Sequence, residues 1–149
     1  MSPPLDHNAV MDIATLQNAI PTYFAPWIQD MGLTVESFGE SKVTLRLPLS
    51  NRLSRTGNQL CGQALMAAAD TAMVLTLINY FGELPSCTTV QLNTVFLRPV
   101  FDQDCLVTAR LIRAGRSLAF GEIDIRGATD DKSVCRATTT FALLDRRSP

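Results

Sequence analysis

The residues best suited to chemistry in this sequence lie around Asp70, in the stretch CGQALMAAADTA at residues 61–72. From Thr56 to Gly82 the chain carries no other charged side chain. Burial among alanines and Met73 would disfavour the charged carboxylate, so we expect a raised pKa and a stronger general base at Asp70. The alternative is a structural aspartate, bonded to a hydroxyl group or to an arginine across a subunit interface.

The scarcity of histidine excludes several catalytic arrangements. The single histidine, His7, lies in the Pro-rich segment SPPLDHN, and we expect residues 1–10 to form a mobile tail. A Ser-His-Asp relay, a Cys-His pair and an ordinary His-containing zinc site all need a histidine held on the scaffold. The sequence therefore excludes these arrangements within the domain, and we expect neither a metal nor a cofactor.

Cysteine usage indicates the compartment. The four cysteines show no Cys-x-x-Cys spacing: Cys61, Cys87, Cys105 and Cys135. No basic-then-apolar export signal stands at the N-terminus. We expect reduced thiols in a cytoplasmic protein.

Length, charge and hydropathy limit the remaining classes. At 149 residues and 46% hydrophobic composition, the chain can form one core, and we expect a single domain over 11–149. The net charge of −1 and the scattered basic residues give no indication of a basic patch that would bind nucleic acid. The apolar run from Gln59 to Phe81 has the length of a membrane span, but a central aspartate costs about 2.5–3.5 kcal/mol on insertion scales. We therefore expect a protein-covered helix and no membrane insertion.

The periodicity of apolar residues predicts one long helix and six strands. Two short helices (11–20 and 22–32) are interrupted by Pro21 and Pro26, and a long helix ends at Gly82 and Pro85. Period-two alternation predicts a hairpin of strands 33–38 and 42–49. After the polar stretch 50–58 and the long helix, it predicts four strands in meander order: 87–99, 103–115, 117–128 and 133–144. This is an α+β fold, a curved antiparallel sheet wrapped around one central helix.

Such a sheet has open edges, which proteins commonly cover by pairing with a second chain. The expected strands are long and apolar, so we expect a homodimer. A monomer whose edges are blunted by lysine or proline is the alternative.

Two strand segments carry a specific resemblance, TTVQLNTVFLRPV at 88–100 and RLIRAGRSLAFGEIDI at 110–125. Together with a glycine at the mouth of a long helix and an aspartate two turns later, they resemble the hotdog-fold acyl-CoA thioesterases, in particular the phenylacetic-acid-pathway group. The resemblance covers about residues 25–144 and combines Phe-Leu-Arg-Pro at 96–99 with Ala-Gly-Arg-Ser at 114–117.

The resemblance implies a set of catalytic positions around the helix start. In the family the helix opens with His-Gly-Gly and the catalytic acid follows nine residues after the histidine, which aligns the acid with Asp70. Gly62 and Gln63 then fall on the two glycines, and Cys61 stands where the family has histidine. The hydroxyl position on the following strand falls on Thr89.

The helix N-terminus has amides that can stabilise an oxyanion, because its first N–H groups have no partner within the helix. Gly62 would let the thioester oxygen approach closely, although a plain packing glycine is the alternative. Asp70 lies eight residues further, about 12 Å along a helix, too far to reach the same carbonyl from one chain. We therefore expect Asp70 of one subunit to face Gly62 of the other, as general base or as nucleophile.

Three further positions keep two interpretations each, and a fourth offers an additional amide group. Arg55 replaces the family's Asn or Gln, and it either pairs with Asp70 and lowers its pKa or turns outward to a substrate phosphate. Thr89 either orients the water or the acid, or is simply a strand residue. Cys61 is a weak donor or an apolar filler, and Gln63 offers an amide that the family's glycine lacks.

Substrate binding is expected at two kinds of surface. The resemblance places coenzyme A phosphates near strand ends and the turn that carry Arg98, Arg113, Arg116 and Ser117. The acyl pocket is expected to be lined by Leu65, Met66 and Ala69, with Trp27 and Phe24 from the N-terminal helices. This favours a medium-chain or aromatic acyl group.

The sequence thus predicts an acyl-CoA thioesterase that acts as a homodimer or a dimer of dimers, with sites shared between subunits. The alternative is a non-catalytic acyl-CoA binder or sensor, because the family's His and Asn positions are lost. A hotdog dehydratase is disfavoured because its chemistry needs a histidine with the acid.

Overall fold

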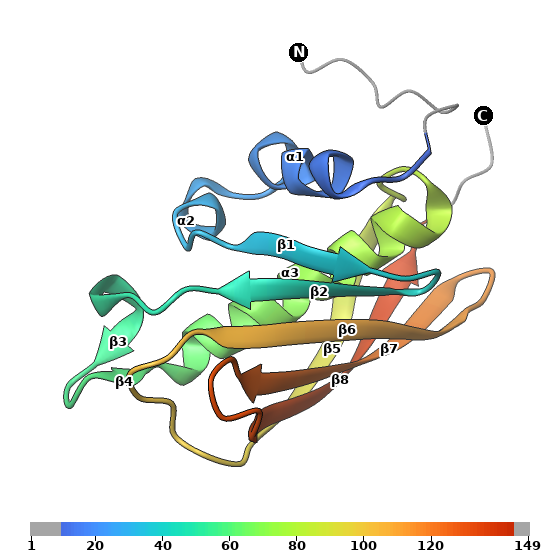
Figure 1. Cartoon of the computed structure of the whole chain (residues 1–149). Helices are drawn as coiled ribbons and strands as arrows, with labels where there is room; N and C mark the ends of the chain where they lie inside the picture. Colours follow the sequence, from blue (N-terminus) through green and yellow to red (C-terminus); the bar gives the residue numbers. More distant parts are fainter. Residues whose placement is uncertain (1–9, 145–149) are drawn as a thin grey trace.

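A computed structural model describes residues 10–144, so His7 and most of the expected tail lie outside the described residues. The described chain forms a six-stranded antiparallel sheet around one long helix, which confirms the predicted α+β hotdog architecture (Figure 1). The sheet strands are β1 (Thr34–Phe38), β2 (Lys42–Leu47), β5 (Cys87–Phe96), β6 (Cys105–Ala114), β7 (Leu118–Gly127) and β8 (Ser133–Leu143).

The strand order is β1-β2-β6-β7-β8-β5, so the predicted meander is wrong for β5. β6, β7 and β8 follow one another, but β5 pairs with β8 at the sheet edge and β6 pairs with β2. The connection 97–104 must therefore cross from the edge to the middle of the sheet. It is held by a hydrogen bond from the Leu60 amide to the Val100 carbonyl (3.1 Å) and by a bridge between Gln59 and Phe101. Hydrophobic alternation identifies strands but does not specify their neighbours.

The central helix α3 (Gly62–Phe81) ends at the predicted glycine. It ends because Gly82 adopts φ +79° and donates its amide to the Ile78 carbonyl, a left-handed cap that glycine adopts without strain. Although α3 is long and apolar enough to cross a membrane, eleven of its twenty residues are buried in the fold. The core helix of a globular domain has the same length and composition.

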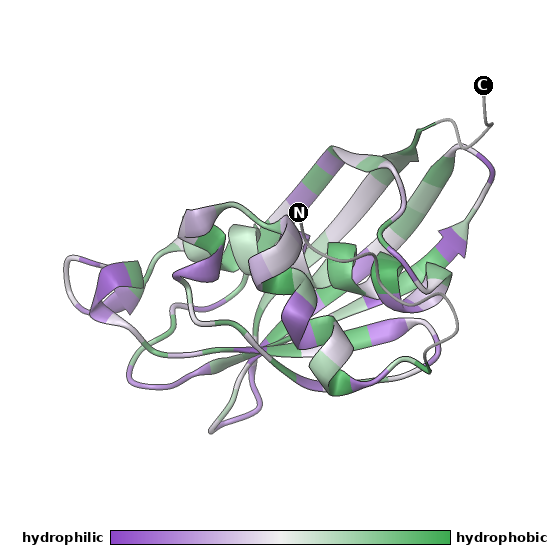
Figure 2. Cartoon of the chain, turned by 90° about the horizontal axis from the view of Figure 1, so that it is seen from above, coloured by the Kyte–Doolittle hydropathy of each residue, from purple (hydrophilic) through white to green (hydrophobic). Residues whose placement is uncertain are grey.

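The sheet covers α3 with alternating side chains. In β2, Val43, Leu45 and Leu47 are fully buried, while the intervening positions face away from the helix. Figure 2 shows the same alternation as hydrophobic and hydrophilic segments along the strands. The polar stretch 50–58 is more ordered than expected, since it contains a 3-10 helix (Asn51–Leu53) and strand β3 (Ser54–Arg55), which pairs with β4 (Gln59–Leu60).

The N-terminal helices differ from the prediction at Pro21. Helix α1 (Ile13–Tyr23) continues through Pro21, and α2 (Pro26–Gln29) begins with proline at its first position. Tertiary contacts compensate for the lost backbone donor: Leu16 and Ile20 are buried, and the Gln17 amide group bonds both the Leu33 carbonyl and the Val35 amide. These contacts fix α1 on β1 close to the end of α3 (Figure 1).

Gly121 marks the tightest contact between the sheet and α3. A Cβ atom there would overlap the end of the Met73 side chain and would lie 3.1 Å from the Arg110 carbonyl oxygen. We expect Gly121→Ala to lower the free energy of unfolding by about 1–3 kcal/mol, because the helix must move or Met73 must leave its rotamer. Urea denaturation measures the change, and additivity of Gly121→Ala with Met73→Ala would contradict this contact as its cause.

Candidate functional site

Asp70 and Thr89 form the polar centre of the candidate site. The Thr89 hydroxyl, on β5, donates a 2.8 Å hydrogen bond to Oδ1 of Asp70, which projects from the middle of α3. A β-bulge in β5 between Thr89 and Gln91 allows Thr89 and Leu92 to face the helix on the same side. The structure therefore brings together two residues that are nineteen positions apart in the sequence.

The electrostatics of Asp70 agree with the sequence-based expectation. Burial raises the pKa of the half-buried Asp70 carboxyl above its ordinary value, and the hydrogen bond from Thr89 lowers it to a lesser extent. No ion pair joins Arg55 to Asp70 among residues 10–144, where Arg55 lies exposed in β3. Within one subunit, Asp70 is thus a partly desolvated acid that a single hydroxyl group orients.

Removal of the Thr89 hydroxyl should change the pH dependence of any reaction that uses ionised Asp70. In Thr89→Val the pKa-lowering hydrogen bond is lost, so the pKa of Asp70 rises further and the acid limb of the kcat/KM profile moves to higher pH. Initial rates measured between pH 4 and 8 test this. Thr89→Ser, which keeps the hydroxyl, is the matched control, and an unshifted limb in Thr89→Val would contradict the orienting role.

The start of α3 has backbone donors but no capping side chain. Cys61 occupies the N-cap with an extended backbone, and no side-chain hydrogen bond caps the helix there. The amides of the first turn, including those of Gly62 and Gln63, therefore lack partners within the helix. Cys61 itself is half-buried and Gln63 is exposed.

Gly62 also has a packing role. A Cβ atom at Gly62 would lie 3.2 Å from the tip of the Phe96 ring, closer than most side chains tolerate. Phe96 follows the inward face of β5 and is 49% exposed, so its ring covers the helix start and still meets solvent. Packing alone thus accounts for a glycine at this position, and its role as an oxyanion donor stays a prediction.

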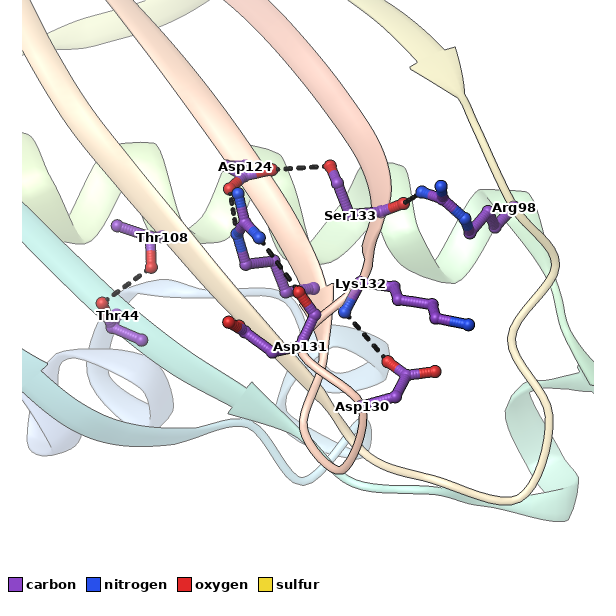
Figure 3. A network of polar contacts seen from close by, with 9 residues as sticks. Thr44, Arg98, Thr108, Asp124, Asp130, Asp131, Lys132 and Ser133 are labelled. Carbon is purple, nitrogen blue, oxygen red and sulfur yellow. Dashed lines mark hydrogen bonds and ion pairs between the residues drawn. The ribbon is translucent and has the colours of Figure 1, made fainter.

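The arginines expected at the coenzyme A site lie in separate places. The Arg98 guanidinium donates to the Ser133 carbonyl (2.7 Å) near the end of β5 (Figure 3). Arg116 and Ser117 are exposed in the β6–β7 turn, where the Ser117 carbonyl accepts a hydrogen bond from the Leu143 amide near the start of β5. Because ten strand residues span about 33 Å, one chain does not bring Arg98 and Arg116 together.

The residues expected to line an acyl pocket do not form one pocket either. Leu65 and Ala69 are buried in the core, and Met66 and Trp27 are exposed. The structure instead has an apolar cavity of about 290 Å³ that Phe24 lines and these four residues do not. Its lining comes from the end of α1, from α3, from the α3–β5 loop and from two strands: Tyr23, Phe24, Val74, Leu84, Pro85, Cys87, Thr88, Thr89 and Phe141.

Sequence reasoning missed this cavity, although one signal was available. Val74 lies four residues after Asp70, so the two side chains share one face of α3. The other contributors come from distant parts of the chain, and only the folded structure shows that they meet.

A second hollow lies on the outer face of the sheet. It measures about 450 Å³ and has five charged residues in its lining: Arg110, Glu122, Asp124, Arg126 and Arg136. Within it, Asp124 accepts a hydrogen bond from Arg126 (2.6 Å) and another from the Ser133 hydroxyl (2.9 Å), the second of which can be followed in Figure 3. Among residues 10–144 no group of three or more His, Cys, Asp or Glu side chains could hold a metal ion.

Comparison with known proteins agrees with the fold. Residues 60–134, half of the chain, match the thioesterase superfamily. A protein of Thermoplasma acidophilum that is named as a proposed esterase is 26% identical over 109 residues, which cover 73% of this chain and 80% of the relative.

Solved structures show the same fold. A thioesterase from Haemophilus influenzae has a TM-score of 0.81 at 22% identity, covering 94% of this chain and 97% of the other. The PaaI protein from the phenylacetic acid degradation operon of Escherichia coli has a TM-score of 0.76 at 18% identity, covering 90% and 97%. With the matched sequence and the six-stranded sheet around α3, this chain belongs to the thioesterase superfamily and has its hotdog fold.

Proposed function

We propose that this protein is an acyl-CoA thioesterase, which hydrolyses a medium-chain or aromatic acyl-CoA to the free acid and coenzyme A. The observation that carries the proposal is the half-buried Asp70 carboxyl, bonded to the Thr89 hydroxyl, in a helix that carries no other charge. Residues 10–144 contain no histidine, so thioester hydrolysis by their side chains needs an acid that can accept a proton or attack the carbonyl carbon, and Asp70 has the raised pKa that suits a base.

Two routes use the same carboxylate. As general base, Asp70 removes a proton from water while the water oxygen attacks the thioester carbonyl carbon. As nucleophile, it forms an anhydride that water then hydrolyses. In both routes the C–S bond breaks, the sulfur leaves as the thiolate of coenzyme A, and the thiolate is then protonated. The negative charge that develops on the carbonyl oxygen needs donors such as the free amides at the start of α3.

We also propose that the active unit is a homodimer that forms through β5. This ten-residue strand is the last in the order of the sheet, with β8 as its one neighbour among the described strands, and Val90 and Val95 are 60% and 55% exposed on it. A long, apolar, exposed edge favours pairing with another strand. Across a two-fold axis, antiparallel pairing brings the start of one β5 beside the end of the other.

This pairing would complete the site from two halves. One half contains Asp70 and Thr89, with Arg116 and Ser117 at the same end of β5. The other half contains the start of α3 at Gly62, together with Arg98 at the opposite end of β5. A site shared between two subunits then explains both why Asp70 lies far from Gly62 along α3 and why Arg98 lies far from Arg116 within one chain. In this arrangement the exposed Arg116 and Ser117 bind coenzyme A phosphates.

A coenzyme A release assay tests the proposed function. The purified protein is given acetyl-, hexanoyl-, decanoyl- and phenylacetyl-CoA, and free thiol is measured. We expect hydrolysis of the medium-chain or aromatic esters. Tight binding of decanoyl-CoA with no thiol release from any ester would instead support the non-catalytic binder, which the replacement of the family's histidine by Cys61 favours.

A further inference from the structure

We infer that the acyl group of the substrate lies in the 290 Å³ apolar cavity between the end of α1, the middle of α3 and the start of β5, and that this cavity limits the acyl length. The inference rests on the proposed thioesterase function. It differs from the sequence-based expectation because the cavity excludes Leu65, Met66 and Ala69, and it keeps from that expectation the contribution of Phe24 at the end of α1.

The position of the cavity relative to Asp70 is the first argument. Thr89 lines the cavity and also donates its hydroxyl hydrogen to Asp70. Val74, also in the lining, follows Asp70 by one helical turn on the same face of α3. Asp70 itself is not part of the lining, but its partner Thr89 and its neighbour Val74 are, so the acyl chain of a thioester held against the Asp70 carboxylate can enter the cavity.

The chemistry of the cavity wall is the second argument. No charged side chain lines the cavity, and its aromatic and aliphatic members include Phe24, Val74, Leu84 and Phe141. Phe141 is only 1% exposed, so one wall belongs to the rigid core. The larger hollow on the outer sheet face has five charged residues in its lining, which would oppose the burial of a hydrocarbon chain.

The volume of the cavity sets the size of the acyl group. A space of about 290 Å³ holds about ten water molecules at ~30 Å³ each, which is room for a medium-length acyl chain, whereas part of a long-chain fatty acyl group would extend beyond it. Each methylene that leaves water for the cavity should raise kcat/KM by about fourfold until the cavity is full. We therefore expect kcat/KM to rise from butyryl-CoA to decanoyl-CoA and to fall at palmitoyl-CoA.

Two variants change the cavity in opposite directions. Val74→Phe extends a larger side chain into the open space, so the ratio of kcat/KM for decanoyl-CoA to that for butyryl-CoA should fall at least tenfold. Phe24→Ala enlarges the cavity, so the ratio of palmitoyl-CoA to decanoyl-CoA should rise. Ile112→Phe is the matched control, because Ile112 is 59% exposed and lies outside the cavity lining; both ratios should stay as in the unmodified protein.

The outcomes separate this inference from the proposed function. If the unmodified protein hydrolyses acyl-CoA esters but neither Val74→Phe nor Phe24→Ala changes the chain-length ratios, the acyl group lies elsewhere and the inference is wrong, while the thioesterase proposal stands. If the unmodified protein hydrolyses no ester, both are wrong. A thermal melt of each variant identifies misfolding, and Phe24→Ala alone decides the question if Val74→Phe does not fold.

Discussion

Asp70→Asn should lower kcat for acyl-CoA hydrolysis by about 10²–10⁴-fold, the usual contribution of a general base. The amide keeps nearly the shape of the carboxyl group, and its oxygen can still accept the Thr89 hydrogen bond, but it can neither take a proton from water nor attack the carbonyl carbon. Steady-state kinetics with decanoyl-CoA measure the change. Asp30→Asn, at an exposed aspartate that ends α2, is the matched control and should leave kcat unchanged.

The stability of Asp70→Asn should not decrease at neutral pH. Burial raises the pKa of Asp70 in the folded state, so the unfolded chain ionises first, and stability is lost as the pH rises from the ordinary value of an aspartate through the raised folded-state pKa. The neutral amide removes this cost, and the variant should gain stability relative to the unmodified protein as the pH rises from 4 to 7. Calorimetric melts across this range test the sign. Full activity in Asp70→Asn would contradict a catalytic role for Asp70.

Mixing two inactive variants should restore activity if the site is shared between subunits. In Asp70→Asn both sites of the dimer lack the acid. In Gly62→Val a branched side chain blocks the helix amides and should lower kcat by about 10–10³-fold. After refolding as a mixture, a heterodimer contains one site with both groups altered and one with both intact. Equal amounts should therefore recover about a quarter of the unmodified activity.

Two measurements make the mixing experiment decisive. Differently tagged subunits show by co-purification that heterodimers have formed, and melts of Gly62→Val show whether the domain still folds despite the contact with Phe96. Heterodimers that form and stay inactive would contradict a site that pairs Asp70 with the Gly62 amide of another subunit. A charged substitution at the exposed Val95 of β5 should weaken dimerisation and activity together.

Local rules predicted most of the elements. The glycine cap fixes the end of α3, and apolar alternation locates the strands within a few residues. Two features depended on distant contacts and were predicted wrongly. Helix α1 continues through Pro21 because buried side chains and Gln17 anchor it, and β5 lies beside β8 because the 97–104 segment crosses the sheet.

The candidate site also combines features that local sequence predicts with features that depend on distant contacts. Asp70 could be identified because a lone charge in an apolar helix is unusual, and its raised pKa follows from that local burial. The contact with Thr89 came from the resemblance, since strand propensity alone does not distinguish Thr89 from Thr88. The apolar cavity could not be predicted, because Tyr23, Val74 and Phe141 are far apart in the chain and only their packing encloses it.

The end of α1 lines the proposed acyl cavity but contributes none of the proposed reacting groups. The acid, its hydroxyl partner and the helix start all lie within residues 60–134, the part that matches the superfamily, whereas Tyr23 and Phe24 precede it. With the acyl group in the proposed cavity, we expect exchange of the N-terminal helical segment between homologous chains to alter which substrates are accepted while the proposed reacting groups stay in place. The N-terminal helical segment would then be a part of the chain that protein engineers can vary on its own to change substrate selectivity.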